Sequence, residues 1–213
     1  MRSTVMLVVV LTLVCLISAL ALALVNGLTE ERIAEQKRLA ELRAVSEALL
    51  HGGIVCDNDP SRDAITIPGW KGKDGTPKRV CLGRKEGKVM GVAFTSAGEG
   101  YGGFITVMIG VELTGKLTGI VILEHLETPG LGANIESAEL FRDQFKGKYR
   151  EGSPKGELRR VEKGEVADDN WEIEALTGAS VSPEGVVQAI NAGLKKFDTY
   201  KNEILAKAEG RTQ

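Results

Sequence analysis

The sequence predicts an α+β fold in which an antiparallel or mixed sheet with flanking helices follows one N-terminal transmembrane helix. Three patterns lead to this prediction. An apolar run without charges opens the chain, segments rich in Ile, Val and Leu fill its middle, and an amphipathic helical pattern closes it. The 213 residues suffice for one domain with a substantial core in addition to these attachments.

Charge and composition argue against nucleic-acid binding. The net charge is −2 at pH 7, and only 5% of the residues are aromatic. A surface that binds nucleic acid through electrostatics and base stacking has a basic excess and clustered aromatic rings. We therefore expect no nucleic-acid partner.

The run from Val5 to Val25 contains no charged residue, and such a run spans about 30 Å as a helix, the thickness of the hydrocarbon core. The sequence Ala21-Leu22-Ala23 resembles a signal-peptidase site, but the apolar run is longer than a typical signal peptide and continues past it. We expect a retained single-span anchor within residues 1–27, with a short cytoplasmic tail. So short a tail before a long domain favours export of that domain.

Residues 28–53 are predicted to form a juxtamembrane helix. Thr29 is the expected cap, the helix runs to Leu50, and the sequence His51-Gly52-Gly53 ends it. Its narrow apolar stripe is expected to pack on the chain's own domain. The stripe consists of Ile33, Leu39, Leu42, Val45 and Leu49.

Residues 54–213 form the predicted extracytoplasmic domain. Its two cysteines, Cys56 and Cys81, form a disulfide or remain structural thiols with equal plausibility. They belong to no CxxC pair and no Cys/His group with zinc spacing, so we expect no metal site. The segment from Asp57 to Lys78 is rich in Gly, Pro, Asp and Lys and is predicted to be a loop.

The remaining pattern predicts strands first and helices later. The expected strands are Arg79–Arg84, Lys88–Thr95, Phe104–Leu113 and Leu117–Leu126, followed by a helix at Glu136–Phe145, a strand pair at Glu157–Val161 and Trp171–Leu176, and a helix at Pro183–Lys207.

Two stretches imitate nucleotide-binding motifs and fail on context. Gly98 to Gly103 satisfies GxGxxG, but a strand follows where the dinucleotide motif needs a helix. Gly110 to Lys116 satisfies GxxxxGK, but Leu117 replaces the hydroxyl that binds magnesium. The glycines at 98–103 are better explained by a mobile loop or by close approach of the backbone to a flat ligand.

The strand section closes with a rigid Pro-Gly turn in the sequence Glu124-His125-Leu126-Glu127-Thr128-Pro129-Gly130-Leu131-Gly132. His125 and Glu127 are expected on a solvated strand face. A zinc site is not expected, because His125 has no histidine nearby.

The stretch from Leu176 to Pro183 places hydroxyl side chains and a glycine before a strong helix start. Ser182 is the expected N-cap and Pro183 the first helical residue. Free N–H groups and the positive end of the helix dipole favour a phosphate carried by Thr177 or Ser180. A capped helix after a tight turn explains the same residues without a ligand.

Three stretches together resemble a known family. They are GYGGFITVMIGVELTGKLTGIVILEHLETPGLG from Gly100 to Gly132, EALTGASVS from Glu174 to Ser182, and the N-terminal span. They resemble the membrane-anchored FMN-binding subunits of ion-translocating electron-transport complexes, namely the G subunit of the Rnf complex and the C subunit of the sodium-pumping NADH:quinone oxidoreductase. The compact length is more similar to the Rnf subunit.

The resemblance implies FMN joined through its phosphate to Ser180 by a flavin transferase, at a position where the family more often has threonine. It places Thr177, Gly178, Ala179 and Ser182 around the phosphate. It places Thr128, Pro129, Gly130 and Leu131 near the isoalloxazine ring. No catalytic acid or base is implied, because the flavin supplies the electron chemistry.

The resemblance further implies a redox subunit without independent turnover. It would relay electrons among the other subunits of an Rnf-type complex that oxidises ferredoxin, reduces NAD and moves Na⁺ or H⁺. The span would lie in the lipid bilayer of the inner membrane, with the FMN domain on the periplasmic side. Two other classes remain open: a stand-alone exported flavoprotein reductase, and an anchored binding module without a redox role.

Overall fold

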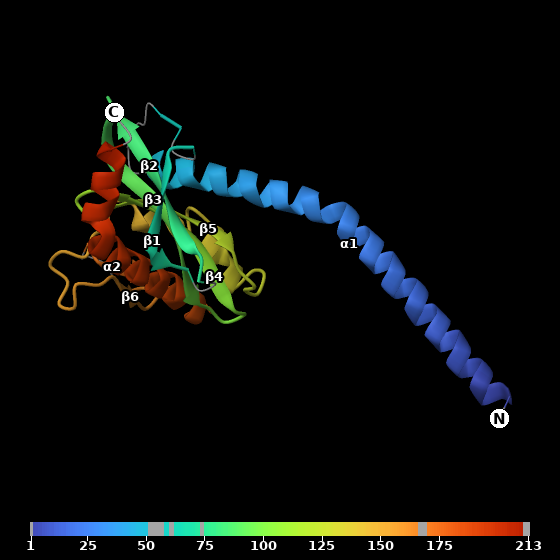
Figure 1. Cartoon of the computed structure of the whole chain (residues 1–213). Coiled ribbons are helices and arrows are strands. Elements are labelled where there is room, and N and C mark those ends of the chain that lie inside the picture. The colour runs from blue at the N-terminus through green and yellow to red at the C-terminus, as the bar shows by residue number, and fades with distance from the viewer. Residues whose placement is uncertain (1, 51–57, 60–61, 73–74, 166–169, 211–213) are drawn as a thin grey trace. The chain divides into compact units, whose positions relative to one another are not determined.

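The computed structural model describes residues 2–50, 58–59, 62–72, 75–165 and 170–210. The chain divides into two compact units, residues 1–40 and 41–213 (Figure 1). The first unit is helical, and the second contains a five-stranded sheet, a two-stranded sheet and a long helix. This architecture confirms the predicted α+β class and the mixture of antiparallel and parallel pairing.

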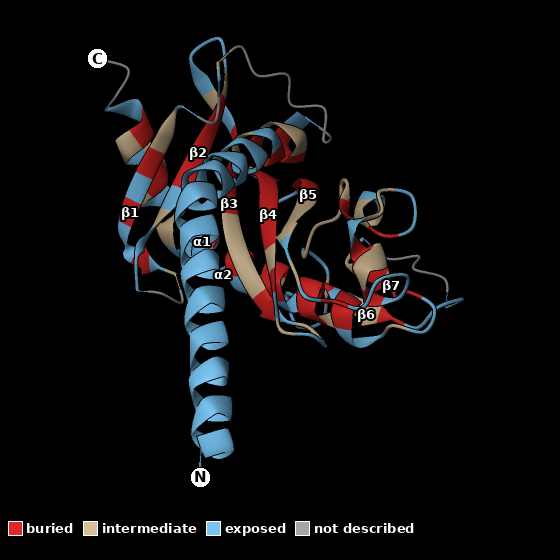
Figure 2. Ribbon diagram, turned by 90° about the vertical axis from the view of Figure 1, so that its right-hand side faces the viewer, coloured by how far each residue is buried: buried red, intermediate tan, exposed pale blue. Residues whose placement is uncertain are grey.

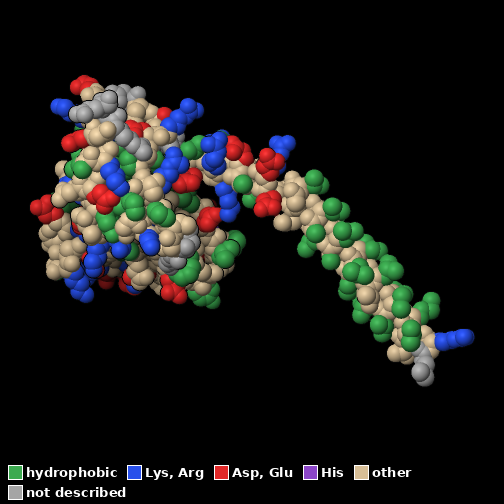
Figure 3. Space-filling view, in the orientation of Figure 1, with side chains coloured by type: hydrophobic (Ala, Val, Ile, Leu, Met, Phe, Trp, Pro, Cys, Tyr) green, Lys and Arg blue, Asp and Glu red, His purple; other side chains and the backbone are tan. Residues whose placement is uncertain are grey.

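Helix α1 runs without interruption from Arg2 to Leu50. An 18-residue window within it has a mean hydropathy of 3.0, so α1 is long and apolar enough to cross a membrane. Hydrophobic side chains surround its N-terminal half in Figure 3. Thr29 was wrongly predicted to cap a separate helix; its hydroxyl bonds back to the carbonyl of Val25 at 2.9 Å, which satisfies it inside a continuous helix.

The main sheet is an antiparallel meander in which each strand pairs with the next along the chain. Its strands are β1 (Ala64–Lys71), β2 (Pro77–Lys85), β3 (Lys88–Glu99), β4 (Phe104–Glu112) and β5 (Leu117–Glu124). The last four confirm the predicted strands to within a few residues. Strand β1 corrects the predicted loop from Asp57 to Lys78: Ile65, Ile67 and Trp70 are buried while their neighbours are exposed, so the strand has one apolar face.

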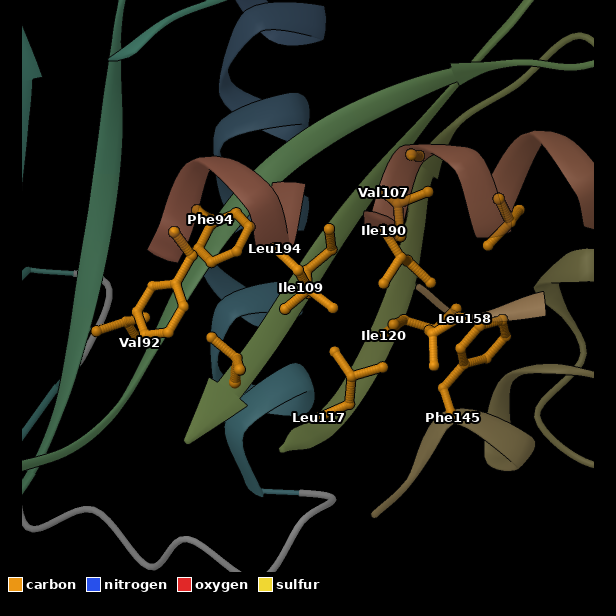
Figure 4. Close-up of a cluster of buried hydrophobic side chains, with 14 of the residues drawn as sticks. Val92, Phe94, Val107, Ile109, Leu117, Ile120, Phe145, Leu158, Ile190 and Leu194 are labelled. Carbon is orange, nitrogen blue, oxygen red and sulfur yellow. The ribbon is translucent and has the colours of Figure 1, made fainter. Parts of the chain in front are cut away.

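One face of the sheet packs against helix α2 (Val181–Glu209), and Figure 2 shows the buried positions concentrated there. Alternate residues of the central strands supply this core because side chains on a strand alternate between faces. Figure 4 shows Val92, Phe94, Val107 and Ile109 from the sheet beside Ile190 and Leu194 of α2.

The opposite face receives the last turns of α1. Ala44, Val45, Ala48 and Leu49 form a second cluster with Cys81, Ala93 and Met108. The prediction that the apolar stripe packs on its own domain is thus confirmed for Val45 and Leu49, whereas Ile33 and Leu39 are exposed. The predicted alternatives for Cys56 lie outside the described residues.

The glycines at 98–103 approach the chain's own backbone. A Cβ on Gly98 would come within 1.9 Å of the carbonyl oxygen of Gly185, and one on Gly102 within 1.9 Å of that of Leu126. Strand β3 and helix α2 therefore touch through their main chains. These contacts within the protein explain both glycines, in place of the expected close approach of their backbone to a flat ligand.

The segment after β5 contains two short 3₁₀ helices, η1 (Gly132–Glu136) and η2 (Arg142–Phe145). The single helix predicted at Glu136–Phe145 is wrong, because Ser137 is extended and ends η1. Phe141 and Phe145 still bury their rings in the core. Strands β6 (Arg159–Val161) and β7 (Glu172–Glu174) then pair in parallel and lead to α2.

Candidate functional site

The first part of the site is a β-turn at residues 128–131. The N–H of Leu131 donates to the carbonyl of Thr128 at 3.2 Å, and Pro129 and Gly130 occupy the two central positions. Gly130 has a φ of +75°, which side chains other than glycine rarely tolerate. Proline followed by glycine is the sequence that a type II turn requires, so this part of the predicted rigid turn is confirmed.

The second part is a similar turn at residues 176–179. The N–H of Ala179 donates to the carbonyl of Leu176 at 3.2 Å, and Gly178 has a φ of +72°. A Cβ added to Gly178 would lie 3.5 Å from the Cδ2 atom of Leu131. The two turns therefore meet, although nearly fifty positions of sequence lie between them.

Helix α2 begins directly after the second turn. Its first residue is Val181, and Ser180 is the N-cap, with φ of −86° and ψ of −29° and no side-chain capping bond. The prediction that Ser182 caps the helix is therefore wrong. Pro183 is instead the third helical residue, which the helix tolerates because N–H groups in its first turn have no intrahelical partner.

The hydroxyl of Ser182 points into the protein. Ser182 is buried and donates a hydrogen bond to Oε2 of Glu127. Glu127 is only 5% exposed, and its Oε1 accepts the backbone N–H of Gly102 at 3.0 Å. The prediction that Glu127 lies on a solvated face is wrong, because these two donors compensate the burial of its carboxylate.

The histidine beside this network has a defined tautomer. The Nδ1 atom of His125 accepts the backbone N–H of Glu127 at 3.0 Å, so the proton must lie on Nε2, which is 2.9 Å from Oε1 of Glu136. His125 is partly buried and was wrongly placed on a solvated face. Within the described ranges, no cluster of three or more His, Cys, Asp and Glu side chains could hold a metal ion.

The two turns and the start of α2 enclose a pocket of about 340 Å³. Six of the nine predicted site residues line it: Thr128, Leu131, Gly178, Ala179, Ser180 and Ser182. Thr177, Pro129 and Gly130 are exposed in the same turns but do not line the pocket. A larger pocket of about 800 Å³ lies beside strand β6 and contains none of the nine.

Three further pocket residues were not predicted: Tyr101, Glu127 and Val181. Tyr101 and Val181 are 78% and 47% exposed and, with Leu131, give the pocket an apolar rim. The aromatic residue inside the glycine-rich stretch was the available signal for Tyr101. Burial of Glu127 had no local signal, since its partners come from distant segments.

The pocket has two parts with the chemistry of a flavin nucleotide. The hydroxyls of Thr177 and Ser180 are exposed and make no hydrogen bond to any described residue. Ser180 adjoins the positive end of a 29-residue helix, which stabilises an anionic phosphoester. The rim of Tyr101, Leu131 and Val181 supplies apolar surface for a flat ring. The residues present therefore fit FMN.

The fold and this site define an FMN-binding domain on an apolar N-terminal helix. The family described as "FMN-binding domain" matches residues 100–195, and the family described as "RnfG N-terminal region" matches residues 2–47. The chain belongs to the RnfG family of the Rnf ion-translocating oxidoreductase complexes. It is an electron-transport flavoprotein family, and its members are components of a larger complex.

Named relatives support this assignment. The RnfG-type component of the ion-translocating oxidoreductase complex of Cereibacter sphaeroides is 35% identical, over 92% of this chain and 85% of the relative. The corresponding component of the Na⁺-translocating ferredoxin:NAD⁺ oxidoreductase complex of Acetobacterium woodii is 31% identical, over 88% of each chain. The crystal structure of Shewanella oneidensis NqrC is 27% identical, covers 70% of this chain and 75% of its own, and has a TM-score of 0.55.

Proposed function

We propose that this chain carries FMN bound covalently to Ser180 through a phosphodiester and relays electrons within an Rnf-type complex. The observation that carries the proposal is the position of Ser180. Its exposed hydroxyl is free of any capping bond, lines the pocket, and immediately precedes the first residue of α2. An N-cap serine normally spends its hydroxyl on the helix N–H groups, so a free one is available for esterification.

The surrounding residues have separable roles in this proposal. Gly178 keeps the turn beside Ser180 without a side chain, which leaves room for a transferase to reach the hydroxyl. The N–H groups of the first turn and the helix dipole stabilise the phosphodiester charge, because no Lys or Arg is found among the described residues that line the pocket. Leu131 and Tyr101 exclude water from the flavin ring. Thr177 and Ala179 frame the phosphate, and Thr128, Pro129 and Gly130 set the position of Leu131.

FMN, when bound, supplies the electron-transfer chemistry, and the protein supplies its position and electrostatic surroundings. We place the domain of residues 54–213 on the periplasmic side, the span of residues 1–27 in the lipid bilayer, and the helix of residues 28–53 between them. A covalent bond suits that side of the membrane, since a dissociable cofactor would be lost there. The immediate partners are the other subunits of the complex and, during maturation, a flavin transferase.

Co-expression of the full chain with a flavin transferase tests the attachment. We expect a fluorescent band on a denaturing gel and an intact mass raised by one FMN less one water. Both should vanish in Ser180→Ala and persist in Ser180→Thr, which keeps the hydroxyl. Thr177→Ala is the matched control and should retain the flavin. Flavin that persists in Ser180→Ala and disappears in Thr177→Ala would move the attachment to Thr177.

Membranes that lack the native subunit test the relay. Ferredoxin-dependent NAD reduction should be restored by the wild-type chain and not by Ser180→Ala, at equal amounts of protein in the membrane. The purified chain alone should show no turnover. Electron transfer by the isolated flavoprotein to a soluble acceptor, without the other subunits, would instead support the stand-alone reductase.

A further inference from the structure

The carboxylate of Glu127 is the one charged group among the described residues that line the Ser180 pocket. It is 5% exposed, and among the described residues it takes part in no ion pair. Its two hydrogen-bond donors are neutral: the Ser182 hydroxyl and the Gly102 N–H. A buried carboxylate is expensive to desolvate, so its retention without a cation calls for an explanation.

The surrounding backbone leaves space for this carboxylate. A Cβ on Gly100 would lie 2.4 Å from Oε1 of Glu127, and one on Gly132 would lie 2.7 Å from Oε2 and 2.4 Å from the hydroxyl of Ser182. Glycine at both positions is what admits the side chain. Three separate segments, the strand β3–β4 connection, the Pro-Gly turn and the start of α2, thus converge on one carboxylate.

We infer that Glu127 is a positioning residue of the flavin site and that its fixed negative charge makes the flavin harder to reduce. The inference rests on the proposed attachment of FMN to Ser180. Glu127 lines the same pocket as Ser180 and bonds the residue two positions further along α2. Reduction adds negative charge to the flavin, and a nearby buried anion opposes that charge because the low dielectric of the site weakens it little.

The hydrogen bonds to Glu127 also set where the walls of the pocket lie. The Gly102 N–H holds the residue after Tyr101, and the Ser182 hydroxyl holds the first turn of α2. The same side chain therefore fixes both the aromatic rim and the phosphate-bearing end of the site. Its neutral isostere glutamine can keep both bonds, because its oxygen accepts the Gly102 N–H and its NH₂ group donates to the Ser182 oxygen.

The test is the midpoint potential of the flavin in the full, flavinylated chain, measured by redox titration of its absorbance. We expect Glu127→Gln to raise the potential, with at least a tenfold shift in the ratio of reduced to oxidised flavin, or about 30 mV for a two-electron couple. Glu99→Gln is the matched control, since it removes the same charge from an exposed position nearby. It should change the ratio by less than about twofold, because solvent screens exposed charges.

A second variant separates charge from packing. Ser182→Ala keeps the carboxylate and removes a donor that partly neutralises it, so its potential should move below that of the wild type. Shifts of the same sign in Glu127→Gln and Ser182→Ala would overturn the inference, and so would an unchanged potential in Glu127→Gln. If Glu127→Gln takes up no flavin, the sign of the Ser182→Ala shift decides alone. Absence of flavin from the wild-type chain would instead refute the proposed attachment.

Discussion

The hydroxyl of Thr118 donates a hydrogen bond of 2.6 Å to the backbone carbonyl of Ala48, which joins strand β5 to the last turn of α1. Both residues are fully buried. The carbonyls of a helix's last turn have no partner within the helix, so a buried helix end needs a donor from elsewhere. Gly110 makes the contact possible, since its Cβ would lie 2.3 Å from the same carbonyl oxygen.

Thr118→Val keeps the shape of the side chain and leaves the Ala48 carbonyl buried without this donor. We expect the free energy of unfolding to fall by about 1–3 kcal/mol. Urea denaturation of the full chain in detergent, followed by tryptophan fluorescence, measures it. Thr66→Val is the control: Thr66 is exposed on β1, and its change should stay within about 0.5 kcal/mol. Equal losses in both variants would contradict a specific role for the bond.

The contact between the backbones of β3 and α2 gives a second prediction. A Cβ on Gly98 would lie 1.9 Å from the carbonyl oxygen of Gly185, and this neighbour is main chain that cannot rotate away. Gly98→Ala should therefore destabilise the domain by about 3 kcal/mol or more. In Gly210→Ala the nearest atom is 3.5 Å away, an ordinary contact, so its melting temperature should match the wild type. A Gly98→Ala protein that melts with the wild type would show that this contact is not tight.

Local patterns predicted most of the fold because they reflect local forces. The apolar strands β3 to β5 and the helical spacing of Val186, Ile190 and Leu194 appear in the sequence as they appear in the core. Strand β1 was missed since its glycine and proline content outweighed the alternation of Ile65 and Ile67. The exposed half of such a strand carries no apolar signal at all.

The site divides along the same line. The two glycine turns and the helix after Ser180 were predictable, because turn and helix-start chemistry depends on neighbouring residues. The burial of Glu127 was not, because its donors on Ser182 and Gly102 lie 55 and 25 positions away. The role of Ser182 failed for the same reason: a hydroxyl that can cap a helix locally found a distant acceptor instead.

Cys81 gives a prediction about pH. Burial raises the pKa of its thiol from 9.0 to about 11. In the reduced chain the unfolded state therefore loses this proton at lower pH than the folded state does. The contribution to stability is fully present below about pH 9 and declines between about pH 9 and 11, by up to roughly 2–3 kcal/mol.

Denaturation of the reduced wild type and of Cys81→Ala across this range measures the effect. The difference between their unfolding free energies should be constant from about pH 7 to 8.5 and should then shift against the wild type as pH rises. A difference that stays constant to about pH 11 would mean that the thiol titrates alike in both states.

Leu131 links the geometry of the turns to the flavin. It is 47% exposed, lines the pocket and contacts the second turn at Gly178. Leu131→Ala should leave the bond at Ser180 intact and change stability by no more than about 0.5 kcal/mol, because the side chain is half-exposed. It should, however, open the ring to solvent, so iodide should quench flavin fluorescence more strongly than in the wild type.

Leu140→Ala is a matched control for this variant, since Leu140 is 53% exposed and does not line the pocket. Both variants lose the same side-chain atoms at similar exposure, so a general loosening of the surface would raise quenching in both. Quenching raised in Leu131→Ala alone places the ring against the Pro-Gly turn, because only that turn changes. Equal quenching in the two variants and the wild type would mean that the ring lies against another part of the rim, and Tyr101 would then be the first residue to replace.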